Sequence, residues 1–127
     1  MSKRKNSKKI TTDKLKTQLK QMKFKRVIIE SPYKGDIERN THYARLCLQH
    51  SLDMGEAPIA SHLLYTQILD EDVQHERMLG INAGLAWKEV AEAQVFYIDY
   101  GMSEGMKYAL KYATENKIPI VYRKILE

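Results

Sequence analysis

Short apolar runs alternate with helix-like segments from residue 26 onward, and this alternation constrains the fold more than any other feature. Three runs rich in β-branched and aromatic residues, 26–30, 94–98 and 118–122, are predicted strands, and 57–60 is predicted as a further short strand. Between them, helical spacing of apolar residues predicts helices from Asp36 to Met54, from Val73 to Val90, and from Ser103 onward. Such alternation is typical of a parallel sheet covered by helices on both faces. We therefore predict an α/β fold, Rossmann-like or flavodoxin-like, with about four to five parallel strands flanked by helices.

The apolar positions also predict which face of each helix packs against the sheet. In the first helix the predicted stripe is Ile37, Thr41, Ala44, Leu48 and Leu52. In the second it is Met78, Ile81 and Leu85, and in the third it is Met106, Ala109, Leu110 and Ala113. The segment 61–72 shows no clear period, so we expect a long loop there.

Composition excludes several classes of protein. The single cysteine, Cys47, cannot form an internal disulfide, and it leaves no CxxC redox or zinc motif. No apolar run approaches the roughly 18 residues of a membrane helix, and the N-terminus lacks the apolar segment of a secretory signal. We therefore expect a cytoplasmic protein without a transmembrane segment.

Charge divides the chain into two parts. Residues 1–26 contain eleven Lys or Arg and one Asp, a balance of +10, whereas the rest contains ten Lys or Arg against fifteen Asp or Glu, a balance of −5. We therefore separate a basic N-terminal tail, residues 1–25, from an α/β domain, residues 26–127.

The basic tail contains a possible short helix. Residues 1–9 are too polar to offset the entropy of ordering, and we expect them to be mobile. From Thr12 onward, Leu15, Leu19 and Met22 at helical spacing predict a short basic amphipathic helix. Such a segment can contact nucleic-acid phosphates, an acidic partner or an anionic membrane surface, or it can be a solvated helix that rests on the domain.

Two loops are candidates for ligand binding, because ligands of parallel sheets bind outside the carboxyl ends of the strands. The first loop, 31–36, joins the first strand to a helix, so free amides and the helix dipole favour an anion there. Tyr33 offers an aromatic face and a hydroxyl, and Gly35 permits backbone that a side chain would block. The predicted ligand-binding residues are Ser31, Tyr33, Lys34, Gly35, Asp36 and Arg39, and the alternative is an ordinary turn.

The second loop follows the third strand and is the better candidate for a phosphate or ribose site. Ser103 can cap the next helix, and Gly105 leaves the start of that helix uncovered. Asp99 can face a ribose hydroxyl or act as an acid or base, or it can be a capping or turn aspartate. His62 can donate to the same ligand from the end of the second strand, or it can be a buried structural histidine. This set comprises His62, Asp99, Gly101, Ser103, Glu104 and Gly105.

Neither loop matches the GxGxxG or Walker pattern, so we predict no NAD or ATP-hydrolysis chemistry and no cofactor. The histidines do not follow the spacing of metal ligands either, and we predict no metal site. They are His42, His50, His62 and His75.

Taken together, several motifs resemble the nucleoside 2-deoxyribosyltransferase-like superfamily, and within it small phage and bacterial members. The resemblance covers roughly residues 26–123 and rests on SPYKGD (31–36) followed by Glu38-Arg39-Asn40, PIASHL (58–63), DVQHERMLG (72–80) and YGMSEGM (100–106). Members of the superfamily cleave or exchange the N-glycosidic bond of deoxynucleosides or deoxynucleoside monophosphates. The resemblance therefore implies a nucleotide-sized pocket at the strand ends, with Tyr33 and Ser103 contacting sugar and phosphate.

One position departs from the superfamily. There, a glutamate six residues after the serine attacks the anomeric carbon, but six residues after Ser103 this chain has Ala109. Asp99 and Glu104 are the nearest candidate catalytic carboxylates. Our leading hypothesis is a non-catalytic nucleotide-binding protein that sequesters or senses a nucleotide or a nucleotide-derived signal.

Two alternatives stay open at this point. One is an active deoxyribosyltransferase or deoxynucleoside-monophosphate N-glycosidase, and the other is a nucleic-acid or protein adaptor that acts through residues 1–25. The resemblance also implies a homo-oligomer, and a phage-encoded member would act in the host cell cytoplasm. Candidate interface residues are Tyr65, Trp87 and Tyr100.

Overall fold

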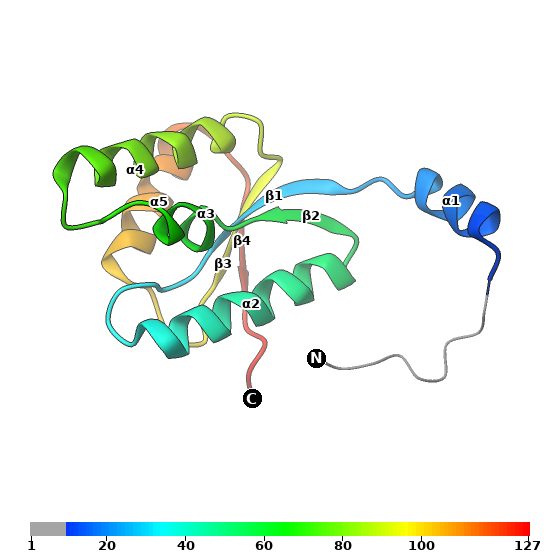
Figure 1. Cartoon of the computed structure of the whole chain (residues 1–127), viewed down its shortest axis with the longest axis horizontal. Coiled ribbons are helices and arrows are strands. Elements are labelled where there is room, and N and C mark those ends of the chain that lie inside the picture. Colours follow the sequence, from blue (N-terminus) through cyan, green and yellow to red (C-terminus); the bar gives the residue numbers. More distant parts are fainter. Residues whose placement is uncertain (1–9) are drawn as a thin grey trace.

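Four β-branched runs form one parallel sheet in the structure, a computed structural model that describes residues 10–127 (Figure 1). The strands are β1 (Lys25–Glu30), β2 (Glu56–Ile59), β3 (Ala93–Tyr97) and β4 (Ile120–Arg123), in the spatial order β2-β1-β3-β4. In the register, Ile28 lies opposite Ile59 on one side and Gln94 on the other, and Val95 lies opposite Val121. The predicted α/β, Rossmann-like class is confirmed, with four strands in the sheet.

Three long helices cover the sheet: α2 (Ile37–Asp53), α4 (Gln74–Lys88) and α5 (Glu104–Glu115). Side-chain caps start two of them, because Asp36 accepts from the amide of Arg39 at 3.0 Å and Ser103 accepts from the amide of Met106 at 3.2 Å. In Figure 1, α2 lies on one face of the sheet and α4 and α5 lie on the other. The α2 face buries Val27, Ile29, Tyr43, Cys47, Val95 and Tyr97, whereas Phe96 packs with Met106 and Ala109 on the α5 face.

The α5 stripe is confirmed, since Met106, Ala109 and Ala113 are buried, but the predicted α2 stripe is confirmed only at Ala44 and at Leu48, which is partly buried and packs against the core. Of its members only Ala44 is buried, and Ile37 and Leu52 are each 49% exposed. The buried face of α2 is Asn40, Tyr43, Ala44, Cys47 and Ser51. The helix is rotated because its buried polar side chains find hydrogen-bond partners in other elements, which a count of apolar positions does not anticipate.

The predicted face of α4 is also wrong. Met78 and Ile81 are exposed, and the buried residues of this helix are Gly84 and Lys88. A Cβ at residue 84 would lie 3.0 Å from the Oγ of Ser61, so the glycine permits a close approach between α4 and the segment after β2.

Residues 61–72 are not the expected long loop. They contain α3 (Ser61–Leu64) and a 3-10 turn, Tyr65–Gln67. Side chains hold this segment in a helical path, because Thr66 donates to the carbonyl of His62 at 2.7 Å and Gln67 donates to the carbonyl of Leu63. Polar side chains rather than a stripe of apolar residues support this helical path. The segment therefore has no apolar period, and its sequence did not predict a helix.

The predicted basic helix forms as α1 (Thr12–Gln21), which is capped by the side chain of Thr11. None of its residues is buried, and it extends away from the sheet beyond the amino end of β1 (Figure 1). The prediction for residues 1–9 lies outside the described residues. Among residues 10–127, no helix combines the length and the hydropathy needed to cross a membrane.

A buried ion pair connects the two edge strands of the sheet. Arg123 at the end of β4 donates from Nη1 and Nη2 to the two carboxylate oxygens of Glu56 at the start of β2, at 2.9 and 2.6 Å. Ser51 of α2 donates to the same carboxylate at 2.7 Å, and Arg123 also donates to the hydroxyl of Tyr97 at 2.9 Å. The side chains of Arg123 and Glu56 are 13% and 11% exposed, so this pair is largely removed from water.

Arg123→Leu is expected to lower the free energy of unfolding by about 3 kcal/mol, because it leaves a buried carboxylate without its counter-charge. Hydrogen bonds from Arg123 hold the pKa of Glu56 below 4.5, so the pair stabilises the fold above that pH and its contribution disappears on acidification. Urea titrations at several pH values measure both effects. Lys107→Leu, which breaks the exposed pair with Glu104, should change little, and an equal loss in both variants would contradict the assignment.

Candidate functional site

The strand order creates a topological switch point between β1 and β3. The chain leaves β1 toward α2 on one face of the sheet and leaves β3 toward α5 on the other (Figure 1). The loops 31–36 and 98–103 therefore both lie at the carboxyl edge of the sheet, and His62 follows the neighbouring strand β2 at the same edge. The structure thus brings all the sequence-predicted site residues to one edge.

One buried side chain fixes the first loop. Asn40, in the first turns of α2, donates from Nδ2 to the carbonyl oxygens of Tyr33 and Lys34, both at 3.0 Å. Its Oδ1 accepts from Nη2 of Arg39 at 3.0 Å. Gly35 has a φ of +98°, a conformation that side chains other than glycine rarely adopt. The loop is therefore held in one shape before any ligand arrives.

Ser31 and His62 form a polar pair behind this loop. The Oγ of Ser31 lies 2.7 Å from Nε2 of His62, and the ring of Tyr33 meets the imidazole edge-on at a centroid distance of 6.5 Å. Burial, and secondarily the charge of Lys88, lower the pKa of His62 to about 4. The imidazole is therefore neutral at pH 7, with one ring nitrogen that donates and one that accepts.

The carboxylate of Asp99 is occupied by other parts of the chain. It accepts from the hydroxyl of Tyr43 at 2.6 Å and from the amides of Ile125 and Leu126, each at 2.9 Å. Burial acts to raise the pKa of Asp99, but these donors outweigh it and lower the pKa below 3.8. This geometry favours the turn aspartate that the sequence left as an alternative.

An aromatic stack joins the two loops. The guanidinium of Arg39, from the first turn of α2, lies 4.1 Å from the ring centre of Tyr100 in the second loop. Tyr43 also packs edge-on against Tyr100, at 4.8 Å between ring centres. Arg39 therefore keeps its positive charge at the edge and also contacts the loop after β3.

The start of α5 carries no carboxylate that faces inward. Ser103 caps the helix, and Glu104 extends into solvent with a side chain that is 92% exposed and paired with Lys107 at 3.2 Å. Ala109 is buried against the sheet, as a member of the apolar stripe. Because Ser103 satisfies only one amide of the first turn, other amides of that turn remain directed outward at the edge.

A buried polar cluster beneath the edge was missed by the sequence analysis. Lys88 of α4 lies 3.2 Å from the carboxylate of Glu30 at the end of β1, and Gln94 of β3 donates to the same carboxylate at 3.0 Å. Burial raises the pKa of Glu30, although Lys88 and Gln94 act in the opposite direction. The Oε1 atom of Gln94 has no hydrogen-bond partner among the described residues. The sequence did contain a signal for this cluster, because Glu30 and Gln94 are polar residues within strands that were predicted to be buried.

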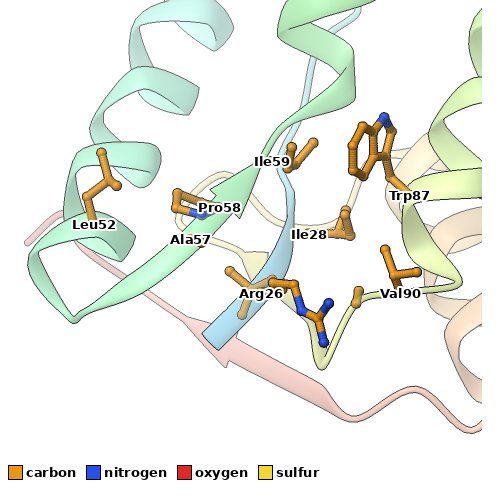
Figure 2. A pocket seen from close by; sticks show the side chains of 10 residues that line it. Arg26, Ile28, Leu52, Ala57, Pro58, Ile59, Trp87 and Val90 are labelled. Carbon is orange, nitrogen blue, oxygen red and sulfur yellow. The ribbon is translucent and has the colours of Figure 1, made fainter. Parts of the chain in front are cut away.

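Two surface hollows lie away from the carboxyl edge. One, of about 350 Å³, is lined mostly by apolar side chains from β1, β2 and the end of α4 (Figure 2). The other, of about 340 Å³, lies where α4 and α5 end, beside Lys88 and Tyr112. Across residues 10–127, no three His, Cys, Asp or Glu side chains are grouped as metal ligands would be.

A family model described as a domain of unknown function (DUF7768) matches residues 25–123. The chain belongs to this family. The matched region begins with β1 and ends with β4, so the family domain contains the whole sheet and excludes α1. Curated proteins and solved structures gave no match to the chain.

The neutral state of His62 can be tested by NMR titration of its ring protons. We expect a pKa of about 4, which means that its burial stabilises the fold fully above pH 6.5 and that this contribution is lost between pH 6.5 and about 4. The variant His62→Gln assigns the signal among the four histidines of the chain. Ser31→Ala should leave the pKa far below 6.5, because burial is the larger cause, and titration near 6.5 in the wild type would contradict the buried geometry.

Proposed function

We propose that the carboxyl edge of the sheet binds a nucleotide or a nucleotide-derived anion and holds it without cleaving it. The observation that carries the proposal is the pairing of two features at one switch point. The loops after β1 and β3 offer backbone donors, cations and an aromatic ring, whereas the expected carboxylates are engaged elsewhere or point away.

The binding half of the proposal rests on complementary groups at the edge. The N-termini of α2 and α5 both open there and favour a negatively charged group. Lys34 and Arg39 add positive charge, and the partly exposed ring of Tyr33 can stack on a base or a sugar. The pair of Ser31 and His62 can exchange hydrogen bonds with hydroxyl or amide groups of a ligand.

The non-catalytic half rests on the carboxylates. Attack at an anomeric carbon needs a free carboxylate close to the sugar. Asp99 is saturated by Tyr43 and by the amides of Ile125 and Leu126, and Glu104 is directed into solvent. A methyl group stands at Ala109, where the superfamily that the motifs resemble has its nucleophile.

The resemblance to the nucleoside 2-deoxyribosyltransferase-like superfamily supports the same ligand class. Two of its motifs, SPYKGD and YGMSEGM, fall in or overlap the two loops that flank the switch point. A protein that binds a ligand without converting it acts only through the bound state. The corresponding biological roles are sequestration of the ligand or sensing of its concentration.

The test mixes the protein at stoichiometric concentration with a panel of nucleotides, removes the protein by filtration, and quantifies intact nucleotide and free base by chromatography. We expect one class of nucleotide to be depleted without release of base, and to be recovered intact after the protein is heated. Free base would show an enzyme instead. If none of the panel is depleted, the nucleotide proposal fails.

Tyr33→Ala should weaken the affinity for the depleted nucleotide by about tenfold or more, because it removes the stacking surface from the first loop. Isothermal titration calorimetry measures the change. Tyr108→Ala is the matched control, since Tyr108 is a solvent-facing tyrosine of α5 that is 61% exposed. Equal affinities for the Tyr33 variant and the wild type would remove the first loop from the binding site.

A further inference from the structure

The apolar side of helix α1 is exposed within residues 10–127. Leu15 and Leu19 lie on one side of this ten-residue helix and Met22 follows directly as its C-terminal cap, and these side chains are 42%, 48% and 45% exposed. Isolated helices shorter than about 12 residues are marginal in water, because their stability in proteins comes from packing of the apolar face. The apolar side of α1 has no such packing within residues 10–127, where none of its residues is buried.

The same chain carries a largely apolar hollow. We call it the base groove, and define it by Ile28, Leu52, Pro58, Ile59, Trp87 and Val90, with Arg26 as a charged residue of its lining. Figure 2 shows Trp87 and Val90 at the end of α4 facing Ile28 and Ile59 of the sheet. Leu52, Trp87 and Val90 are 49%, 46% and 50% exposed, which is a large apolar area for one small surface.

The direction of the chain favours a second copy over the groove of the same chain. Met22, at the C-terminal end of α1, has an extended conformation with φ −76° and ψ 134°, so the chain runs on toward β1 without reversing. Only residues 22–24 separate α1 from β1, and three residues span at most about 10 Å. The helix therefore extends past the amino end of β1, as Figure 1 shows, and does not fold back over the groove beside that strand.

The position of the groove and the charge of α1 also favour a second copy as the partner. The base groove is lined by the amino half of β1 and by β2. Helix α1 leaves the domain from the amino end of the same strand β1 (Figure 1). A two-fold axis beside that side would bring each helix to the groove of the other copy, so that one contact is formed twice. Lys14, Lys16 and Lys20 of α1 would then approach Glu89, the exposed chain neighbour of Val90, whereas Glu92 already pairs with Arg26 at 3.6 Å.

We infer that the protein is a homodimer in which α1 of each copy docks its apolar side, Leu15, Leu19 and Met22, into the base groove of the other. The dimer is independent of the nucleotide proposal, because the base groove and the carboxyl edge lie at different parts of the sheet. The basic charge of the tail serves here as the complement of an acidic domain surface.

The test uses the full chain and its single tryptophan, Trp87, which lies in the groove. Sedimentation velocity across a range of concentrations should show a dimer, and the emission of Trp87 should shift to the blue as the dimer forms. Leu19→Glu on the helix and Val90→Lys in the groove should each raise the dimer dissociation constant by about thirtyfold or more. Thr17→Glu is the control, because Thr17 lies about 200° around the helix from Leu15 and faces the opposite side.

A mixture of the two variants distinguishes this arrangement from other dimers. Leu19→Glu keeps an intact groove and Val90→Lys keeps an intact helix, so together they can restore one of the two contacts. We expect a heterodimer in the mixture, from two proteins that are each monomeric alone and that keep the wild-type circular dichroism spectrum.

Three results would overturn the inference. A dimer that persists in Val90→Lys but is lost in Leu19→Glu would indicate pairing of the two helices with each other. A monomer at all concentrations whose Trp87 emission shifts to the red in Leu19→Glu would show that α1 covers the groove of its own chain. A monomer without that shift would leave both surfaces to a different partner.

Discussion

The carboxylate of Asp99 holds three parts of the chain together at the edge of the sheet where the candidate site lies. It joins the loop after β3 to α2 through Tyr43, and to the segment after β4 through the amides of Ile125 and Leu126. The hydroxyl of Tyr43 also accepts from the amide of Asp99 at 3.0 Å, so the connection runs in both directions. An ionised carboxylate suits this role, because its two oxygens accept several donors at once.

The same arrangement sets the chemical character of the edge. A carboxylate that fixes the backbone of three segments cannot also move to attack a substrate, so the interactions that organise the site also withdraw Asp99 from catalysis. The neutral pair of Ser31 and His62 has a related effect, since it offers hydrogen bonds without a charge. The positive groups at the edge are Lys34, Arg39 and the helix N-termini, all of them suited to binding an anion.

Local sequence patterns predicted the elements of this fold but not all of their orientations. The caps Asp36 and Ser103 and the stripe of α5 follow from short-range rules, because the residues involved are close in sequence. The buried faces of α2 and α4 depend on partners far along the chain, such as Asp99 for Tyr43 and Glu30 for Lys88. Polar residues that find such partners are buried, and they are exceptions to the rule that polar residues face water.

The candidate site, like the fold, was predicted from the sequence only in part. The strand-to-helix alternation placed both loops at one edge, and their position relative to the switch point is confirmed. What the sequence did not contain was the pairing of side chains, since Ser31 and His62 are 31 residues apart and Tyr43 and Asp99 are 56 apart. The role of Asp99 in particular depends on backbone amides at residues 125 and 126, which have no sequence signature.

The position of these late residues has a consequence for how the protein forms during translation. Arg123 neutralises Glu56, and Ile125 and Leu126 saturate Asp99, although both carboxylates belong to segments that are synthesised earlier. Until residues 123–126 leave the ribosome, the nascent chain contains two acidic groups in largely apolar surroundings and a sheet without β4. Such a chain cannot complete its core stepwise, and we expect it to be a substrate for chaperones until these residues emerge and the domain folds as a unit.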